Sequence, residues 1–151
     1  MDIKVAVQAA PFSMDYGYSD ALAGRSDIGA VVSFTGLVRD FNETPDVTGL
    51  TLEHYPGMTE RTLTEIGEQA WQRWSLQAVR IIHRVGYLGP GDPIVRVLVA
   101  SAHRREAFEA CDFIMDFLKT QAPFWKKEHS TRGEYWVKER HSDQQDAARW
   151  E

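Results

Sequence analysis

The sequence predicts one α+β domain with a mostly antiparallel sheet and two main helices. Three observations support this fold class. The chain has 151 residues, the length of a single ordinary domain. Several short runs rich in Val, Ile and Phe are bounded by Gly, Pro and Asp, a pattern typical of strands. Two longer stretches carry apolar residues at helical spacing. Because no repeat or linker divides the chain, we expect a single domain over residues 1–151.

The first half of the chain is predicted to contain three strands. Ile3 to Val7 is a short apolar run, and a weak helical stretch near Ser13 to Leu22 follows it. Ala30 to Val38 is rich in Val, Phe and Thr and ends at polar residues, so we expect a strand there. Leu50 to Tyr55 alternates in period two and stops at a Pro-Gly pair, which predicts a third strand.

Two helices are predicted from apolar residues that recur at helical spacing. The first begins near Met58, and its apolar face comprises Leu63, Ile66, Ala70, Trp71 and Trp74, which we interpret as core. The second begins near His103, and its apolar face comprises Ala107, Phe108, Cys111, Ile114, Met115 and Leu118. Pro123 disfavours helical geometry at Ala122, so we expect the second helix to end near Thr120.

Two hairpins complete the predicted elements. Residues 79–87 alternate in period two, and residues 94–100 form an apolar run. The strong turn sequence Gly89-Pro-Gly-Asp92 lies between them, so an antiparallel hairpin is predicted. Residues 125–129 and 134–137 are expected to form a last hairpin around a glycine.

Composition and charge exclude several classes of protein. The net charge is −5 and the pI is near 5.5, which argues against a nucleic-acid partner and means that only a local basic cluster can hold an anion. No apolar run approaches the roughly 18–20 residues of a membrane span, and the N-terminus lacks the pattern of a signal peptide. A lone cysteine, Cys111, fits a reducing cytoplasm. The tail over residues 139–151 is polar, and we expect it to order only against a partner.

A first candidate site is His103-Arg104-Arg105, at the start of the second long helix. The N-terminus of a helix prefers acidic side chains, so these residues work against the helix dipole unless an anion is bound. Guanidinium groups and free N–H groups would then act on the anion together. The alternative is that the arginines pair with Glu106 or Glu109 on a solvated face.

A second candidate is the segment Ser33-Phe-Thr-Gly-Leu-Val-Arg39. A strand that ends in Gly36 brings backbone close to a ligand, and Arg39 can direct its guanidinium at a phosphate. The alternative is an ordinary strand with a solvated terminal arginine, and the residues of this segment alone favour that reading.

A third candidate combines Lys119 with Lys126 and Lys127. Lys119 falls in the last helical turn, where a lysine complements the helix dipole without any function. Lys126 follows the rigid Pro123-Phe-Trp connector, which can fold it back towards Lys119. Two ammonium groups brought close together lower each other's pKa, and one of them could then transfer protons near neutral pH.

Two other kinds of chemistry are disfavoured. Cys111 lies midway along the apolar face of its helix, where a buried, inert thiol is the usual outcome. The five histidines, which are His54, His83, His103, His129 and His141, show no short spacing typical of zinc ligands. We therefore expect no metal and no cofactor.

Taken in chain order, four segments resemble the signature blocks of one family. They are Ser33 to Arg39, Leu52 to Met58, Ser101 to Arg104 and Ala122 to Glu128. The family that they resemble is the large, catalytic subunit of molybdopterin synthase, and the resemblance runs from roughly Pro11 to the C-terminal tail. Each block alone is weak, whereas four in the right order with matching spacing are highly specific.

The resemblance implies an α/β-hammerhead-type fold and a sulfur-transfer reaction. Such enzymes insert two sulfurs into cyclic pyranopterin monophosphate (precursor Z) and produce molybdopterin. The sulfur is carried as a thiocarboxylate on the C-terminal glycine of a small ubiquitin-like partner, in a heterotetramer of two large and two small subunits. The alternative is a non-catalytic module that binds a phosphorylated ligand or a ubiquitin-like tail, because phosphate binding alone needs no proton transfer.

The resemblance also implies roles for particular residues. Lys119 and Lys126 match the essential lysines of the family. The matching substrate-binding positions, together with two apolar side chains suited to a ring system, are Arg39, Leu37, Val38, His103, Arg104, Lys127, Glu128, Phe34 and Met115.

The spacing of two of these residues adds a geometric constraint. Arg104 and Lys119 are fifteen positions apart (119 − 104), which is roughly 22 Å along a straight helix. Side chains at those two points cannot easily reach one small substrate. The hypothesis is therefore that His103 and Arg104 enter the site from a second copy of the chain, across a homodimer interface.

Overall fold

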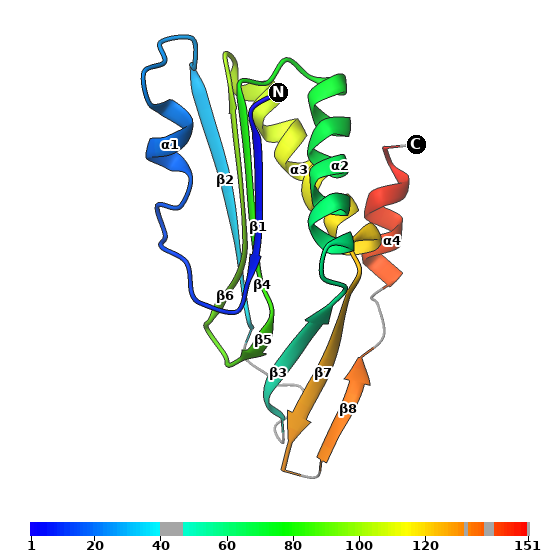
Figure 1. Cartoon of the computed structure of the whole chain (residues 1–151). Coiled ribbons are helices and arrows are strands. Elements are labelled where there is room, and N and C mark those ends of the chain that lie inside the picture. The colour runs from blue at the N-terminus through cyan, green and yellow to red at the C-terminus, as the bar shows by residue number, and fades with distance from the viewer. Residues whose placement is uncertain (40–46, 132, 138–140, 151) are drawn as a thin grey trace.

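The computed structural model describes residues 1–39, 47–131, 133–137 and 141–150. Its architecture confirms the predicted α+β class, with mostly antiparallel strand pairs and two main helices (Figure 1). The strands form two four-stranded sheets, and the second extends beyond one end of the first. Within the described part of the chain, no helix is both long and apolar enough to cross a membrane.

The first sheet has the strand order β1-β4-β6-β2. These strands are β1 (Ile3–Gln8), β4 (Ala78–Arg84), β6 (Pro93–Ser101) and β2 (Ala30–Leu37). Strand β1 runs parallel to β4, and the other two pairs are antiparallel. The predicted hairpin of β4 and β6 is confirmed by this pairing. Within it, His83 of β4 lies opposite Val95 of β6.

Helices α2 (Met58–Arg73) and α3 (Arg104–Gln121) cover one face of this sheet (Figure 1). Their apolar faces meet the valines of β6 in the main core, where Leu63, Ile66 and Phe113 are fully buried. Helix α3 ends one residue past the predicted end, because the residue before a proline favours extended geometry. The sequence periodicity therefore identified both helices and most of their buried sides. Phe108 was assigned to the apolar face of α3 but is 59% exposed.

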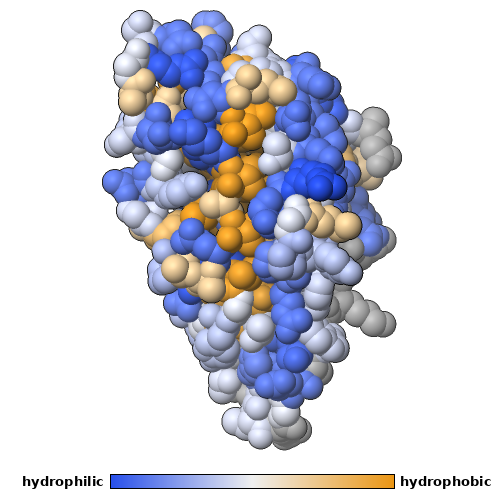
Figure 2. Space-filling view, in the orientation of Figure 1, coloured by the Kyte–Doolittle hydropathy of each residue, from blue (hydrophilic) through white to orange (hydrophobic). Residues whose placement is uncertain are grey.

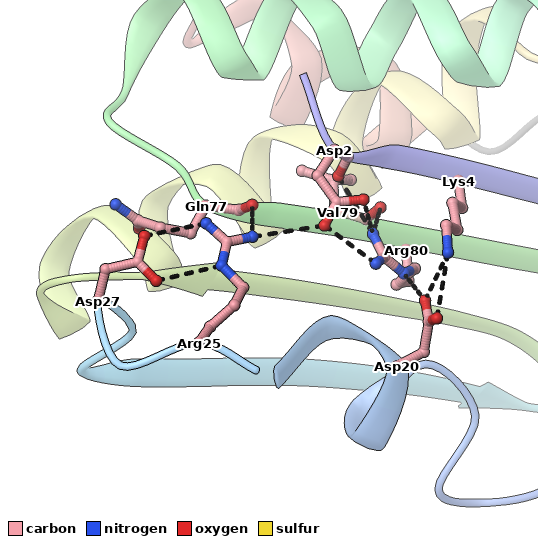
Figure 3. Close-up of polar contacts among 8 residues, drawn as sticks. All are labelled: Asp2, Lys4, Asp20, Arg25, Asp27, Gln77, Val79 and Arg80. Atoms are coloured by element: carbon pink, nitrogen blue, oxygen red, sulfur yellow. Dashed lines mark hydrogen bonds and ion pairs between the residues drawn. The ribbon is translucent and has the colours of Figure 1, made fainter. Parts of the chain in front are cut away.

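The opposite face of the sheet is covered by the segment between β1 and β2, which includes the short helix α1 (Tyr18–Leu22). Buried Arg80 of β4 lies 3.0 Å from Asp2 and 2.9 Å from Asp20 (Figure 3). Hydrogen bonds from Lys4 and then from Arg80 hold the pKa of Asp20 below its ordinary value. The expected helix over 13–22 is thus only five residues long, and side-chain contacts hold the segment in place.

Because both faces of the first sheet are covered, β4 differs from the alternating pattern that was predicted for it. Residues 79–87 were expected to alternate along one strand, but every residue of β4 is buried because both faces of the sheet are covered. The strand also stops at Arg84, and Gly86 adopts a φ of +85° that favours glycine. Strand β5 (Gly86–Leu88) then pairs with β3 in the other sheet.

The second sheet has the order β5-β3-β7-β8 and is antiparallel. Strand β3 (Val47–His54) pairs with β7 (Phe124–Ser130), and β7 pairs with β8 (Gly133–Val137). The predicted last hairpin is confirmed. Leu50, Leu52 and Leu88 form a small second core with Val38, so the end of β2 is tied to this sheet.

The edge strand β1 lies under an apolar strip on the front of the molecule (Figure 2). Its residues Ile3, Val5 and Val7 are half-buried against the main core. Among the described residues, no strand pairs with its outer edge. Exposed Lys4 of the same strand pairs with Asp20 of α1 at 3.0 Å, and a lysine on an edge strand discourages association with another strand.

The C-terminal tail was expected to order only against a partner, and the structure differs from that expectation. Helix α4 (His141–Ala148) contacts α3 of the same chain. Beyond it, the Trp150 ring lies 5.5 Å from Phe113 and 5.7 Å from Trp74. An aromatic ring that covers a helix pair supplies a local reason for the tail to fold without a partner.

Candidate functional site

A hollow of about 500 Å³ lies where β2 ends beside the last turn of α3. Its lining residues are Phe34, Thr35, Gly36, Leu37, Val38, Arg39, Gly91, Ile94, Val95 and Lys119. Five of the predicted site residues, namely Phe34, Leu37, Val38, Arg39 and Lys119, are therefore brought together here. Polar and apolar groups share one concave surface, as expected of a small-molecule site.

Local backbone geometry shapes this hollow. The pairing of β2 with β6 shifts register between Gly36 and Leu37, and such an irregularity bends a strand. A Cβ on Gly36 would lie 2.9 Å from the side chain of Val95, so this position has no room for a larger residue. The Val38 N–H donates to Asp92 O at 2.8 Å, and the Gly91 N–H donates to Val38 O at 2.7 Å. The bend is thus held by the turn before β6.

A buried histidine lies beside the floor of the hollow. His83 on β4 is directly opposite Val95 on β6, and Val95 lines the hollow together with Lys119. Its ring is only 4% exposed and stacks on Phe124, with ring centroids 3.8 Å apart. Burial, together with the positive charges of Lys119 and Lys126, lowers the pKa of His83 to about 3.

The two candidate lysines therefore approach the same buried group from different elements. Lys119 comes from the end of α3, and Lys126 comes from β7, two residues after Phe124. Alternate residues of a strand share a face, so Lys126 projects to the same side as the ring that covers His83. Both lysines are exposed. The predicted return of Lys126 towards Lys119 agrees with this arrangement.

The neighbours of Lys126 on β7 lie on two different faces. Glu128 shares the face of Lys126, whereas Lys127 projects to the other side. There the Lys127 ammonium is 3.7 Å from Glu134 and 4.6 Å from the centre of the Trp136 ring. The structure therefore separates Lys127 from the lysine pair and gives it contacts with β8.

A second hollow, of about 480 Å³, lies at the other end of α3. Its lining residues are His103, Arg104, Arg105, Phe108 and Glu109. Within one chain, the predicted substrate-binding residues His103 and Arg104 do not line the hollow that contains Lys119. The length of α3 separates the two basic clusters, as the helical rise predicted.

The acidic neighbours of these arginines have other partners. Glu106 accepts a hydrogen bond from Ser101, and Glu109 accepts one from the Trp74 ring nitrogen at 2.8 Å. In the described part of the chain, no ion pair within 4.0 Å involves Arg104 or Arg105. Both arginines are exposed beside a helix N-terminus, an arrangement that favours an anion.

Met115 and Cys111 lie within the main core. Met115 is 9% exposed, one helical turn before Lys119, and does not line the hollow. Cys111 is also buried, and burial raises the pKa of its thiol to about 12. The thiol is therefore protonated near neutral pH. The prediction that Cys111 is structural is confirmed by this burial.

His83 is the residue that the sequence interpretation missed. It was considered only as a possible zinc ligand and otherwise as part of an alternating strand. The available signal was a histidine at an inward position of an apolar strand, since such a side chain needs a partner. Ile94 and Val95 were likewise assigned only to a strand.

Comparisons with known proteins identify the family of this chain. The family model described as MoaE protein matches residues 7–121. This chain belongs to the MoaE family. Along its full length it is 57% identical to the whole molybdopterin synthase catalytic subunit of Vibrio cholerae, over 151 residues. The resemblance predicted from the four sequence blocks is thereby confirmed, and so is the prediction of an enzyme.

Solved MoaE structures have the same fold. The molybdopterin biosynthesis MoaE protein from Burkholderia ambifaria is 44% identical, with a TM-score of 0.84, and the match covers 99% of this chain and 98% of that one. A molybdopterin synthase structure from Staphylococcus aureus is 31% identical, with a TM-score of 0.80, and the match covers 87% of this chain and 95% of that one. The predicted fold class is therefore confirmed by similar proteins as well as by the structure of this chain.

Proposed function

We propose that this MoaE protein is the catalytic subunit of a molybdopterin synthase, which converts cyclic pyranopterin monophosphate (precursor Z) into molybdopterin. The observation that carries the proposal is the approach of Lys119 and Lys126 to one neutral, buried histidine beside a hollow that also contains Arg39. The names of the relatives, molybdopterin synthase catalytic subunit, support the same reaction.

The hollow offers groups suited to each part of such a substrate. Arg39 can bind a phosphate through its planar, always charged guanidinium. Phe34 and Leu37 are 41% and 53% exposed, and they offer apolar surface to a pterin ring. Opening the cyclic phosphate and expelling oxygen both require proton transfer, and we assign that task to Lys119 and Lys126. Glu128, on the face of Lys126, is placed near the substrate.

Lys127 and Met115 have indirect roles in this proposal. Lys127 contacts Glu134 and Trp136, and it thereby orients β7 against β8. Met115 supports the last turns of α3 from inside the core and so positions Lys119. Val38 is buried in the small second core and fixes the backbone that carries Arg39.

The sulfur must come from outside the chain. Cys111 is the single cysteine, and its buried, protonated thiol cannot act as a sulfur carrier. We assign sulfur delivery to the thiocarboxylated C-terminal glycine of a small ubiquitin-like subunit. The lone buried thiol also fits work in the reducing cytoplasm.

The second hollow completes the site in a dimer. We place His103 and Arg104 of one subunit against the substrate held by Lys119 and Arg39 of its partner. Arg104 and Arg105, which have no ion pair within the described part of the chain, can bind the phosphate at the helix N-terminus, and one chain holds them apart from the lysines. The proposed assembly contains two large and two small subunits.

The test is Lys119→Ala, assayed with thiocarboxylated small subunit and the cyclic substrate. We expect a loss of at least a hundredfold in molybdopterin formation, because general acid–base groups contribute about 10²–10⁴-fold. Binding of the small subunit and the melting temperature should stay near those of the wild type. The matched control is Lys4→Ala, which removes a lysine that pairs with Asp20 away from the hollow.

Turnover like that of the wild type in Lys119→Ala would overturn the catalytic assignment. A second outcome would support the alternative function, a non-catalytic module in which the basic residues only bind phosphate. If the wild-type protein binds substrate and small subunit tightly but forms no molybdopterin, the chain is a phosphate-binding module instead.

A further inference from the structure

His83 carries the most specific set of contacts that the proposed function leaves unused. It is 4% exposed at the end of β4, between the end of α3 and the start of β7. Its ring lies flat on Phe124, with 3.8 Å between centroids and 17° between planes. Its Nδ1 atom lies 2.8 Å from the backbone oxygen of Arg84. The ring therefore has one fixed position and one fixed orientation.

The contact with Arg84 decides which nitrogen holds the proton. A carbonyl oxygen can only accept, so Nδ1 is the protonated nitrogen and donates the hydrogen bond. A neutral imidazole has one N–H group, so Nε2 presents a lone pair. Among the described residues, the fully enclosed side-chain atoms without a partner are Glu60 Oε1 and Gln77 Oε1. Nε2 is not one of them, so it either reaches the surface or already has a partner, and both cases agree with a donor at this atom.

The groups around His83 explain why the ring stays neutral. Lys119 from α3, Lys126 from β7 and His54 from β3 all oppose a positive charge at this place, in addition to burial. Because the ring stays neutral near pH 7, His83 is too weak a base to transfer protons itself. A neutral acceptor beneath two ammonium groups can still bind one of them.

We propose that His83 is a positioning residue: its Nε2 accepts a hydrogen bond from the Lys119 ammonium and holds that group over the hollow. Lys119 is favoured as the donor because it lines the hollow together with Val95, the residue directly opposite His83. Its charge also lowers the pKa of His83 more than that of Lys126 does. The proposal rests on the proposed function of Lys119. A neutral imidazole orients the lysine without adding the negative charge that a carboxylate would bring, so the ammonium remains available to the substrate.

Three variants separate positioning from support of the fold. His83→Phe retains a ring against Phe124 and removes both nitrogens. His83→Asn retains a donor at the place of Nδ1, and His83→Gln retains an acceptor at the place of Nε2. We expect kcat to fall roughly ten- to a hundredfold in the Phe and Asn variants, with little change in KM, because the reacting group is misplaced. The Gln variant should recover a large part of kcat.

The pH dependence of kcat distinguishes the two roles, because a loss of folded protein lowers kcat at every pH without shifting the profile. A hydrogen bond that the ammonium donates favours its charged form, so removing the acceptor should lower the pKa of the lysine. The basic limb of kcat against pH should therefore move to lower pH in the Phe and Asn variants and return in the Gln variant. Melting temperatures of all three variants show whether a loss of kcat follows a loss of folded protein.

Nitrogen NMR of the free protein tests the inference without any sulfur transfer. We expect the His83 ring to be the Nδ1–H tautomer, and the Lys119 titration midpoint to be lower in His83→Phe than in the wild type. An Nε2–H tautomer, or an unchanged Lys119 midpoint, overturns the positioning role. If the wild-type enzyme fails to make molybdopterin while the NMR result holds, the proposed function fails and the His83–Lys119 contact stands.

Discussion

His83 is buried as a neutral imidazole, whereas in the unfolded chain it titrates near pH 6.5. Between that value and its folded pKa of about 3, the unfolded chain binds more protons than the folded one. The free energy of unfolding must therefore rise with pH across this window. His83 contributes its full stability above pH 6.5, and this contribution is lost progressively as the pH falls towards 3.

We predict that His83→Gln flattens the dependence of stability on pH. Denaturant unfolding between roughly pH 4.5 and 6 should show a slope smaller than that of the wild type by up to about 1.4 kcal/mol per pH unit. This range avoids the titration of Asp20, whose lowered pKa affects stability only at more acid pH. Equal slopes in the two proteins would show that His83 is not buried uncharged.

At the scale of elements, the site depends on how α3 and β7 are connected. Pro123 ends the helix, and Phe124 begins the strand and covers His83. Strand alternation then directs Lys126 to the same side. The proline and the two lysines were recognised in the sequence. The partner of Phe124 was not, because His83 lies forty-one positions earlier (124 − 83) on a strand of the other sheet.

Helix α4 and the residues after it stabilise α3 from outside. The Trp150 ring contacts Phe113 and Trp74, and Arg149 lies 2.7 Å from Asp116. We predict that Trp150→Ala lowers the free energy of unfolding by about 2–3 kcal/mol, because a half-buried indole loses apolar contact area and two ring contacts. Denaturant unfolding measures the change.

Exposed Asp146 on the same helix supplies the control, since Asp146→Ala should alter stability by less than about 0.5 kcal/mol. Limited proteolysis adds a second measurement. In Trp150→Ala the tail should be cleaved faster than in the wild type. Equal cleavage and equal stability would show that the tail does not fold on α3 in solution.

At the scale of the whole molecule, the two hollows lie at opposite ends of α3. Since one helix cannot bring its two ends to one small substrate, the proposed site needs a second subunit. A dimer with twofold symmetry would then contain two identical shared sites.

We predict that Arg104→Ala and Lys119→Ala proteins restore activity when they are mixed. At random pairing half of the dimers are mixed, and each has one intact shared site, so recovery should reach about a quarter of the wild-type activity. Mixing Lys119→Ala with Lys126→Ala is the matched control. Both lysines belong to the same chain's hollow, so no mixed dimer of that pair has an intact site. If verified mixed dimers of both pairs are equally inactive, the site is not shared.

The sequence alone determined most of the main elements and most of the apolar sides of the two long helices. Period-two and helical spacing are local properties, so the two long helices, the two hairpins and the α+β class followed from them. The family resemblance also identified Lys119, Lys126 and Arg39 as candidate site residues. The helical rise indicated the separation of Arg104 from Lys119, because it depends on one element only.

Only the tertiary structure decided which residues meet. Strand order and helix placement are set by long-range packing, which no local pattern encodes. They bring Arg39 beside Lys119, direct Lys127 away from Lys126, and fold the polar tail against α3. They also place His83 beneath both lysines. In the sequence, His83 belongs to the same alternating set as Val79 and Ile81, but the groups that surround it come from three other elements.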